Sequence, residues 1–370
     1  VPEGFDAGPS AIVLVGDTLL GLQRLARWYR DQLDVVVVGI TGSNGKTSTK
    51  DFTSAILRQR FTVHATRGNL NNHIGLPLSV LSADDEDEVL VLEMGMNHAG
   101  EIAPLCEVAR PHVGLITNIG TAHIEFLGSR EAIAEEKGAL ARCLPEVGTL
   151  VVPAGCEFGD YFRARTHART IAAGNGRGVV RAESLRAGDE SSSFELVVDG
   201  LGRVPVELPV AGRHMVTNAL LGAAVGWSLG LSLEEIATGL ERATLTGGRL
   251  RRFESRGVTV IDDTYNANPD SVHAAIETLA EQTLANGHCR TIVLGMMSEL
   301  GKFAAQAHLE VGRHAARAGL RVVSVGTGAA GINEGAVTVA GAEARHFDEY
   351  DEAAAWLGPL LQAGDCVLFK

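Results

Sequence analysis

The hydrophobic pattern of this chain alternates between apolar runs of strand length and stripes of helical spacing. Three apolar runs, each followed by glycine or a polar turn and then a helical pattern, predict buried strands at residues 35–40, 89–92 and 113–117. Strands that alternate with helices are typical of a parallel sheet covered on both faces. The pattern therefore predicts a central α/β domain over residues 34–245.

Two segments depart from this regular pattern. A helical stripe of apolar residues covers residues 11–33, and Asp17 and Thr18 are suited to start the helix. We interpret residues 1–33 as the end of an N-terminal domain and its linker helix. Between residues 178–210, alternating apolar and polar positions predict an inserted antiparallel hairpin.

The pattern of strands and helices restarts in the last third of the chain. Apolar runs at residues 258–261, 291–294, 322–325 and 366–369 are again separated by helical stretches. We expect a second, smaller α/β domain over residues 246–370, with a doubly wound, Rossmann-like sheet.

The composition of the chain argues against several classes of protein. The 370 residues include 32 Lys and Arg against 45 Asp and Glu, a net charge of -13, which argues against a nucleic-acid-binding surface. No apolar run has the length of a membrane span, and the first residues lack the layout of a secretory signal, so we expect a cytoplasmic protein. The five cysteines are far apart and lack Cys-x-x-Cys spacing, which predicts neither a disulfide framework nor a zinc site.

The first predicted strand leads into a phosphate-binding loop and then a helix. The loop is Thr41-Gly42-Ser43-Asn44-Gly45-Lys46-Thr47, followed by Ser48. Gly42 and Gly45 allow successive backbone N–H groups to face phosphate oxygens, Lys46 supplies a point charge, and the Thr47 hydroxyl can bind magnesium. Phosphate binding by itself does not distinguish a ligase from a kinase or a switch GTPase.

Three titratable residues belong to the same region. Glu93 ends the second predicted strand and His123 follows the third, so both lie at the edge of the sheet where ligands bind in open α/β folds. Lys137 shares a helical face with Ile133 and Leu140. From spacing alone we favour snorkelling of Lys137 to the surface over burial as a neutral, nucleophilic amine.

Several motifs resemble those of the Mur ligases, and the resemblance covers essentially the whole chain. In order and spacing they are Thr41–Ser48, Gly68-Asn69-Leu70-Asn71-Asn72-His73-Ile74-Gly75-Leu76-Pro77, Glu93-Met94-Gly95-Met96-Asn97, Thr117-Asn118-Ile119-Gly120-Thr121-Ala122-His123 and Asp262-Asp263-Thr264-Tyr265-Asn266-Ala267-Asn268-Pro269-Asp270-Ser271. The last run is similar to that of family members that add D-alanyl-D-alanine.

The resemblance implies roles for individual residues. It implies that Lys137 is carbamylated, which reverses the interpretation from spacing, and that this anion and His123 hold a second magnesium. Catalytic roles would fall to Lys46, Lys137, His123 and Arg249. Metal binding would fall to Thr47, Glu93, His123 and Lys137. Nucleotide contacts would come from the phosphate loop with Asn218, Asp263 and Arg249. The substrate path would be lined by Asn69, Asn71, Asn72, Asn97, Tyr265 and Asn266.

The resemblance further implies an activity, namely ATP-dependent joining of D-alanyl-D-alanine to UDP-N-acetylmuramoyl-tripeptide through an acyl phosphate, with two Mg²⁺ ions. A monomer is expected. The family's N-terminal UDP-binding domain is expected to be largely absent from this chain. Met215 and Met296 stand where the family usually has asparagine and aspartate.

Two other functions remain open from the sequence. A folylpolyglutamate-type ligase would share the phosphate loop and magnesium arrangement but should lack the run at residues 265–269. A nonenzymatic nucleotide switch would explain the loop, but it would leave Lys137 and His123 without a role.

Overall fold

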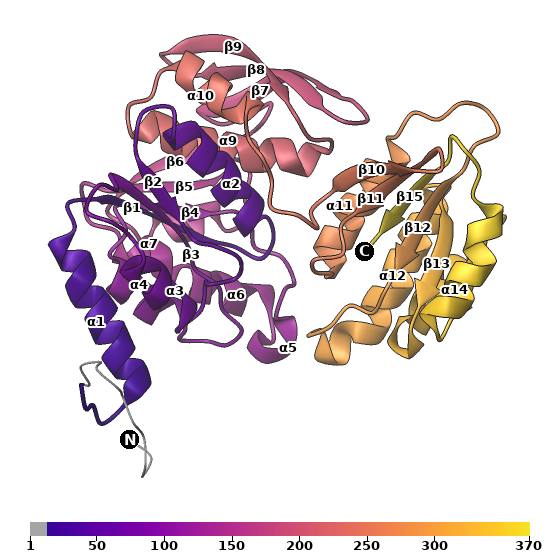
Figure 1. Cartoon of the computed structure of the whole chain (residues 1–370), viewed down its shortest axis with the longest axis horizontal. Helices are drawn as coiled ribbons and strands as arrows, with labels where there is room; N and C mark the ends of the chain where they lie inside the picture. Colours follow the sequence, from indigo (N-terminus) through magenta and orange to yellow (C-terminus); the bar gives the residue numbers. More distant parts are fainter. Residues whose placement is uncertain (1–12) are drawn as a thin grey trace.

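The computed structural model describes residues 13–370, which form two sheets flanked by helices (Figure 1). Helix α1 (Thr18–Gln32) begins where the sequence indicated, because the Asp17 side chain accepts a hydrogen bond from the Leu20 amide at 2.9 Å. The predicted helix was too long at its start, since residues 13–17 precede α1. The part of the N-terminal prediction that concerns residues 1–12 lies outside the described residues.

The first sheet has nine strands in the order β2-β3-β1-β4-β5-β6-β7-β8-β9. The three predicted strands are confirmed as β1 (Val36–Thr41), β3 (Val89–Glu93) and β4 (Val113–Ile116), with β1 pairing in parallel to both neighbours. Three further parallel strands were not predicted. They are β2 (Val63–Ala65), β5 (Thr149–Pro153) and β6 (Arg169–Asn175). The first has three residues, and the last is rich in alanine and glycine, which have low strand propensity.

The predicted antiparallel insertion is part of the same sheet. It consists of β7 (Val180–Ala187), β8 (Ser192–Val198) and β9 (Gly202–Leu208). These strands pair antiparallel with one another, and β7 pairs in parallel with β6. The insertion therefore extends the parallel sheet instead of forming a separate unit.

Helices cover both faces of the first sheet. One face is covered by α2 (Lys46–Leu57), α9 (Arg213–Ser228) and α10 (Leu233–Glu241), and the other by α1, α3 (Gly75–Leu81), α4 (Ile102–Ala109) and α7 (Ala139–Cys143). Short helices α5 (Ile124–Leu127), α6 (Arg130–Lys137) and α8 (Gly159–Arg163) complete this half. Within residues 13–370, no helix has the length and apolar character needed to cross a membrane.

The second sheet has six strands in the order β10-β11-β15-β12-β13-β14. The four predicted strands are confirmed as β11 (Val258–Asp262), β12 (Arg290–Leu294), β13 (Arg321–Val325) and β15 (Cys366–Phe369). The sequence did not predict the two edge strands, antiparallel β10 (Arg251–Ser255) and parallel β14 (Ala344–Phe347). Their sequences mix polar and apolar residues, which suits the exposed edge of a sheet.

The second sheet is also covered on both faces. Helices α11 (Pro269–Ala280), α12 (Ala304–Arg317) and α13 (Ala330–Ala336) pack on one face, and α14 (Tyr350–Leu357) lies on the other. Three 3₁₀ turns, η1 (Gly301–Phe303), η2 (Thr327–Ala329) and η3 (Gly358–Leu360), join these elements. The doubly wound arrangement predicted from the sequence is thus present.

The packing of α10 on α2 yields a test of the core. A Cβ added to Gly239 would lie 2.4 Å from the Ile56 Cα, so the helices approach closely enough to exclude a side chain. We expect Gly239→Val to lower the free energy of unfolding by about 1–3 kcal/mol through overpacking. Denaturant unfolding measures this value. Gly247→Val is the control, because a Cβ at that position meets no atom within 4 Å. Equal stability of both variants would contradict the packing.

Candidate active site

Three loops of the first half meet at one edge of the sheet. Ile40 of β1 lies opposite Glu93 of β3, and Thr41 lies opposite Ile116 of β4. Because these strands are parallel and adjacent, the loops that follow them converge. The phosphate loop therefore stands between the segments that carry Glu93 and His123.

The phosphate loop passes directly into α2. Gly45 caps the helix with φ 77°, and a Cβ there would lie 2.7 Å from the Asn218 side chain, so both conformation and space require glycine. The Lys46 amine donates a hydrogen bond to the Gly42 carbonyl at 2.9 Å. Burial lowers the pKa of Lys46, as does Arg249, whereas Glu93 opposes the shift. A phosphate anion at this position would restore the charge that burial disfavours.

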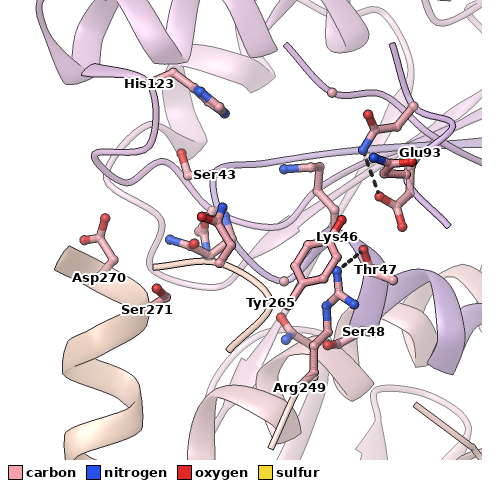
Figure 2. Close-up of a pocket in the computed structure, with 18 of the residues that line it drawn as sticks. Ser43, Lys46, Thr47, Ser48, Glu93, His123, Arg249, Tyr265, Asp270 and Ser271 are labelled. Atoms are coloured by element: carbon pink, nitrogen blue, oxygen red, sulfur yellow. Dashed lines mark hydrogen bonds between the residues drawn. The ribbon is translucent and has the colours of Figure 1, made fainter. Parts of the chain in front are cut away.

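The loop faces a cavity of about 490 Å³ that both halves of the chain line. Figure 2 shows Lys46, Glu93 and His123 around a common space, with Arg249 and Tyr265 approaching from the other half. The predicted site residues that line the cavity are Ser43, Asn44, Gly45, Lys46, Thr47, Ser48, Asn69, Asn71, Asn72, Glu93, Asn97, His123, Asn218, Arg249, Asp263, Tyr265 and Asn266. Three predicted residues, Thr41, Gly42 and Lys137, do not line it.

Glu93 has the character of a cation ligand. Its side chain is buried, one carboxylate oxygen accepts a hydrogen bond from the Asn71 amide at 3.4 Å, and the other oxygen has no hydrogen-bond partner among the described residues. A buried, unpartnered carboxylate oxygen is costly unless a cation or donor satisfies it. Hard oxygen donors such as Glu93 and Thr47 suit Mg²⁺.

His123 connects the two halves of the chain. It occupies the left-handed region with φ 63°, and its Nδ1 lies 2.5 Å from a carboxylate oxygen of Glu299, which has φ 60°. Burial lowers the pKa of His123, and Lys46 and Lys137 lower it further, whereas Glu299 opposes them. Within residues 13–370, no three His, Cys, Asp or Glu side chains are grouped so as to hold a metal ion. Any cation held by Glu93 or His123 therefore needs ligands of another kind.

Lys137 is not among the residues that line the cavity. It is the last residue of α6 and is 1% exposed. Snorkelling, the interpretation favoured by spacing alone, is therefore wrong. Burial lowers the pKa of Lys137 well below its usual value, and Lys46 lowers it further against the opposing charge of Glu136. Burial therefore disfavours the protonated form of the amine.

Residues of the second half bind directly to the loops of the first. The Arg249 guanidinium donates to the Thr47 hydroxyl at 2.9 Å and lies 3.9 Å from the centre of the Tyr265 ring. The Asn268 amide donates to the Asn44 side chain at 2.6 Å. These contacts place a second cationic side chain beside the phosphate loop.

The sequence did not single out several side chains that line the cavity, including His73, Glu101, Asn118, His214, Asp270, Ser271 and Lys370. Asp270 accepts hydrogen bonds from the amide and hydroxyl of Thr121, and Lys370 forms an ion pair with Asp263. Asp270 stood within a quoted motif, but Lys370 had no signal beyond its place at a strand end. Met215 lines the cavity beside Asn218, whereas Met296 is exposed and lies outside it.

Two family models match the chain. The Mur ligase middle domain matches residues 40–226, and the Mur ligase glutamate ligase domain matches residues 248–370. The chain belongs to the Mur ligase family.

Several relatives of this chain carry the same name. UDP-N-acetylmuramoyl-tripeptide–D-alanyl-D-alanine ligase of Bacillus subtilis is 38% identical, covering 97% of this chain and 78% of that protein. The same-named ligase of Escherichia coli is 37% identical over 85% of this chain and 70% of its own length. A crystal structure of MurF from Acinetobacter baumannii superposes with a TM-score of 0.90 at 36% identity, over 97% of this Mur ligase and 78% of that chain. The structure of MurF from Thermotoga maritima in complex with ADP superposes with a TM-score of 0.85 at 30% identity. The match covers 99% of this chain and 83% of that chain.

His214, which lines the cavity, should make the stability of the protein depend on pH. Burial and nearby Lys370 lower the pKa of His214 to about 4, below the value of about 6.5 expected in the unfolded chain. As pH falls from about 6.5 to 4, the unfolded state binds a proton that the folded state does not, so the free energy of unfolding falls. We expect His214→Gln to reduce this acid-induced loss, measured by thermal unfolding across that range.

The exposed His167 provides the control, and His167→Gln should keep the wild-type pH dependence. The stability of His214→Gln should still depend on pH to some extent, because burial also lowers the pKa of His112 and His273. An unchanged slope in His214→Gln would contradict the assignment.

Proposed function

We propose that this chain joins D-alanyl-D-alanine to UDP-N-acetylmuramoyl-tripeptide at the expense of ATP, in the synthesis of the peptidoglycan precursor. The observation that carries the proposal is the hydrogen bond of Arg249 to Thr47 across the cavity, which completes a phosphate site from two halves of a Mur ligase. Relatives at 37–38% identity that carry the name of this ligase support the choice of substrates. ATP and the UDP-linked precursor are substrates of the cytoplasm, where we place the reaction.

The nucleotide phosphates bind to the loop from Ser43 to Ser48. The amides at the start of α2, the Lys46 amine and the Arg249 guanidinium all offer hydrogen-bond donors to anions. Asn218 and Asp263 line the same cavity and are assigned to the nucleoside. The ADP complex of the related Thermotoga maritima MurF supports this use of the cavity.

The residues present fit divalent cations, because Glu93 has a buried oxygen without a partner among the described residues and Thr47 lines the same cavity. We assign one Mg²⁺ to Thr47 and Glu93, and a second to His123 and carbamylated Lys137. Magnesium bound there neutralises phosphate charge. The Arg249 guanidinium donates a hydrogen bond to the Thr47 hydroxyl, and the Asn71 side-chain amide donates to one oxygen of Glu93.

Carbamylation of Lys137 explains the unusual state of its side chain. A neutral amine can attack carbon dioxide, forming an N–C bond and releasing a proton, which converts the side chain into an anion. The positive charge of nearby Lys46, which lowers the pKa of the free amine, would stabilise that anion.

In the reaction, the terminal carboxylate of the tripeptide attacks the γ-phosphate of ATP, and ADP leaves. The amine of D-alanyl-D-alanine then attacks the acyl phosphate, and phosphate leaves as the amide bond forms. Lys46 and Arg249 neutralise the anionic groups and align them. The tripeptide is assigned to Asn69, Asn71, Asn72 and Asn97, and the side chains of Tyr265 and Asn266 face the reacting groups from the other half.

Product formation should require all three substrates together. We expect phosphate release from ATP only when both UDP-N-acetylmuramoyl-tripeptide and D-alanyl-D-alanine are present, measured by a coupled phosphate assay with mass detection of the amide product. Phosphate release with a folate and glutamate would instead support the folylpolyglutamate-type ligase. Slow hydrolysis of GTP or ATP that neither acceptor stimulates would support a nucleotide switch.

Lys137 provides the sharpest single test of the carbamate. We expect Lys137→Ala to abolish ligation, and added bicarbonate not to restore it, because the amine that binds carbon dioxide is gone. Short carboxylic acids should restore part of the activity by supplying the missing carboxylate. Lys302→Ala, at an exposed lysine, is the matched control and should keep wild-type turnover. Wild-type turnover by Lys137→Ala would refute the carbamate.

A further inference from the structure

Glu136 is a buried carboxylate immediately before Lys137. One of its oxygens accepts a hydrogen bond from the Gly100 amide and the other from the Ile102 amide, both at 2.7 Å. The residue is only 8% exposed. Hydrogen bonds from backbone N–H groups to an ionised carboxylate are among the stronger ones in proteins. This pair of bonds joins Glu136 to Gly100 and Ile102, which lie 36 and 34 residues before it in the sequence.

The segment held by Glu136 forms part of the cavity wall. Ile102 is the first residue of α4, and Gly100 has φ 85°, a conformation that turns the chain into the helix. The Asn97 amide donates to the Glu101 side chain at 2.7 Å, and both of these residues line the cavity. The position of the loop at residues 97–102 therefore depends on the carboxylate of α6.

Both oxygens of Glu136 are engaged by amides at the N-terminus of α4, where a helix favours negative charge. The carboxylate therefore anchors the start of α4 and the loop that precedes it.

We infer that Glu136 is a positioning residue for the ligation, which fixes the Asn97 loop for the peptide substrate. The inference rests on the proposed function. A purely structural role of Glu136 would affect all substrates alike. The Asn97 loop is assigned to the peptide substrate, whereas the phosphate loop that binds ATP lies on other elements. Loss of Glu136 should thus affect the substrates unequally.

The experiment compares Glu136→Ala and Glu136→Gln with Glu135→Ala. Glu135 precedes Glu136 on the same helix but is exposed and pairs with Arg142 at 2.8 Å, so its variant makes a matched change of charge and size. Glu136→Gln keeps one acceptor oxygen and serves if the alanine variant folds poorly. Steady-state kcat and KM are measured for ATP, UDP-N-acetylmuramoyl-tripeptide and D-alanyl-D-alanine, with and without added bicarbonate.

We expect Glu136→Ala to lower kcat/KM for the UDP-linked tripeptide by about 10- to 100-fold, the usual effect of losing a group that orients a site. The KM for ATP should stay at the wild-type value. Bicarbonate should not restore turnover, because loss of a neighbouring negative charge does not disfavour the carbamate anion. Glu136→Gln should be intermediate, and Glu135→Ala should match the wild type.

Two results would overturn the inference. One is wild-type kinetics in both Glu136 variants, and the other is an equal loss for all three substrates in proportion to a smaller folded fraction by circular dichroism. Amide hydrogen exchange of residues 97–102 gives a readout that does not need activity, and faster exchange in Glu136→Ala than in Glu135→Ala is expected. A wild-type chain without ligase activity would refute the proposed function, whereas the exchange result would still decide whether Glu136 holds the loop.

Discussion

The site depends on the parallel pairing of β1 with β3 on one side and β4 on the other. Parallel neighbours end at the same edge of a sheet, so the sheet brings together the phosphate loop, Glu93 and the segment leading to His123. Side chains far apart in the chain thereby share one cavity. The pairing of the strands therefore determines at which edge of the sheet a ligand binds.

Basic side chains in and around the cavity are buried, which disfavours their charged forms. Burial lowers the pKa of Lys46, Lys137, His123 and His214, and each of these residues also experiences a positive charge from a neighbouring lysine or arginine. Such a cluster is unfavourable until anions enter, and then each ion pair is strong because water is largely excluded. A reaction between a nucleotide triphosphate and a carboxylate supplies those anions.

The second half of the chain completes the site through a few polar contacts. Arg249 reaches Thr47, Asp270 accepts from Thr121, and Glu299 pairs with His123. His123 and Glu299 are both non-glycine residues with positive φ, a conformation that the surrounding structure must hold. Contacts of this kind couple the arrangement of the two halves to the geometry around the phosphates.

The sequence by itself determined the strand-loop-helix order, the phosphate loop, the two α/β patterns and the motifs that resemble Mur ligases, because these depend on local spacing and hydrophobic periodicity. It did not reveal short or edge strands such as β2 and β14, whose polar or brief sequences carry little periodicity. The tertiary structure decided that Lys137 is buried, that Glu136 binds the amides of α4, and that Lys370 pairs with Asp263. Burial and long-range pairing depend on which elements pack together, and helical spacing is the same for a lysine that reaches water and for one that does not.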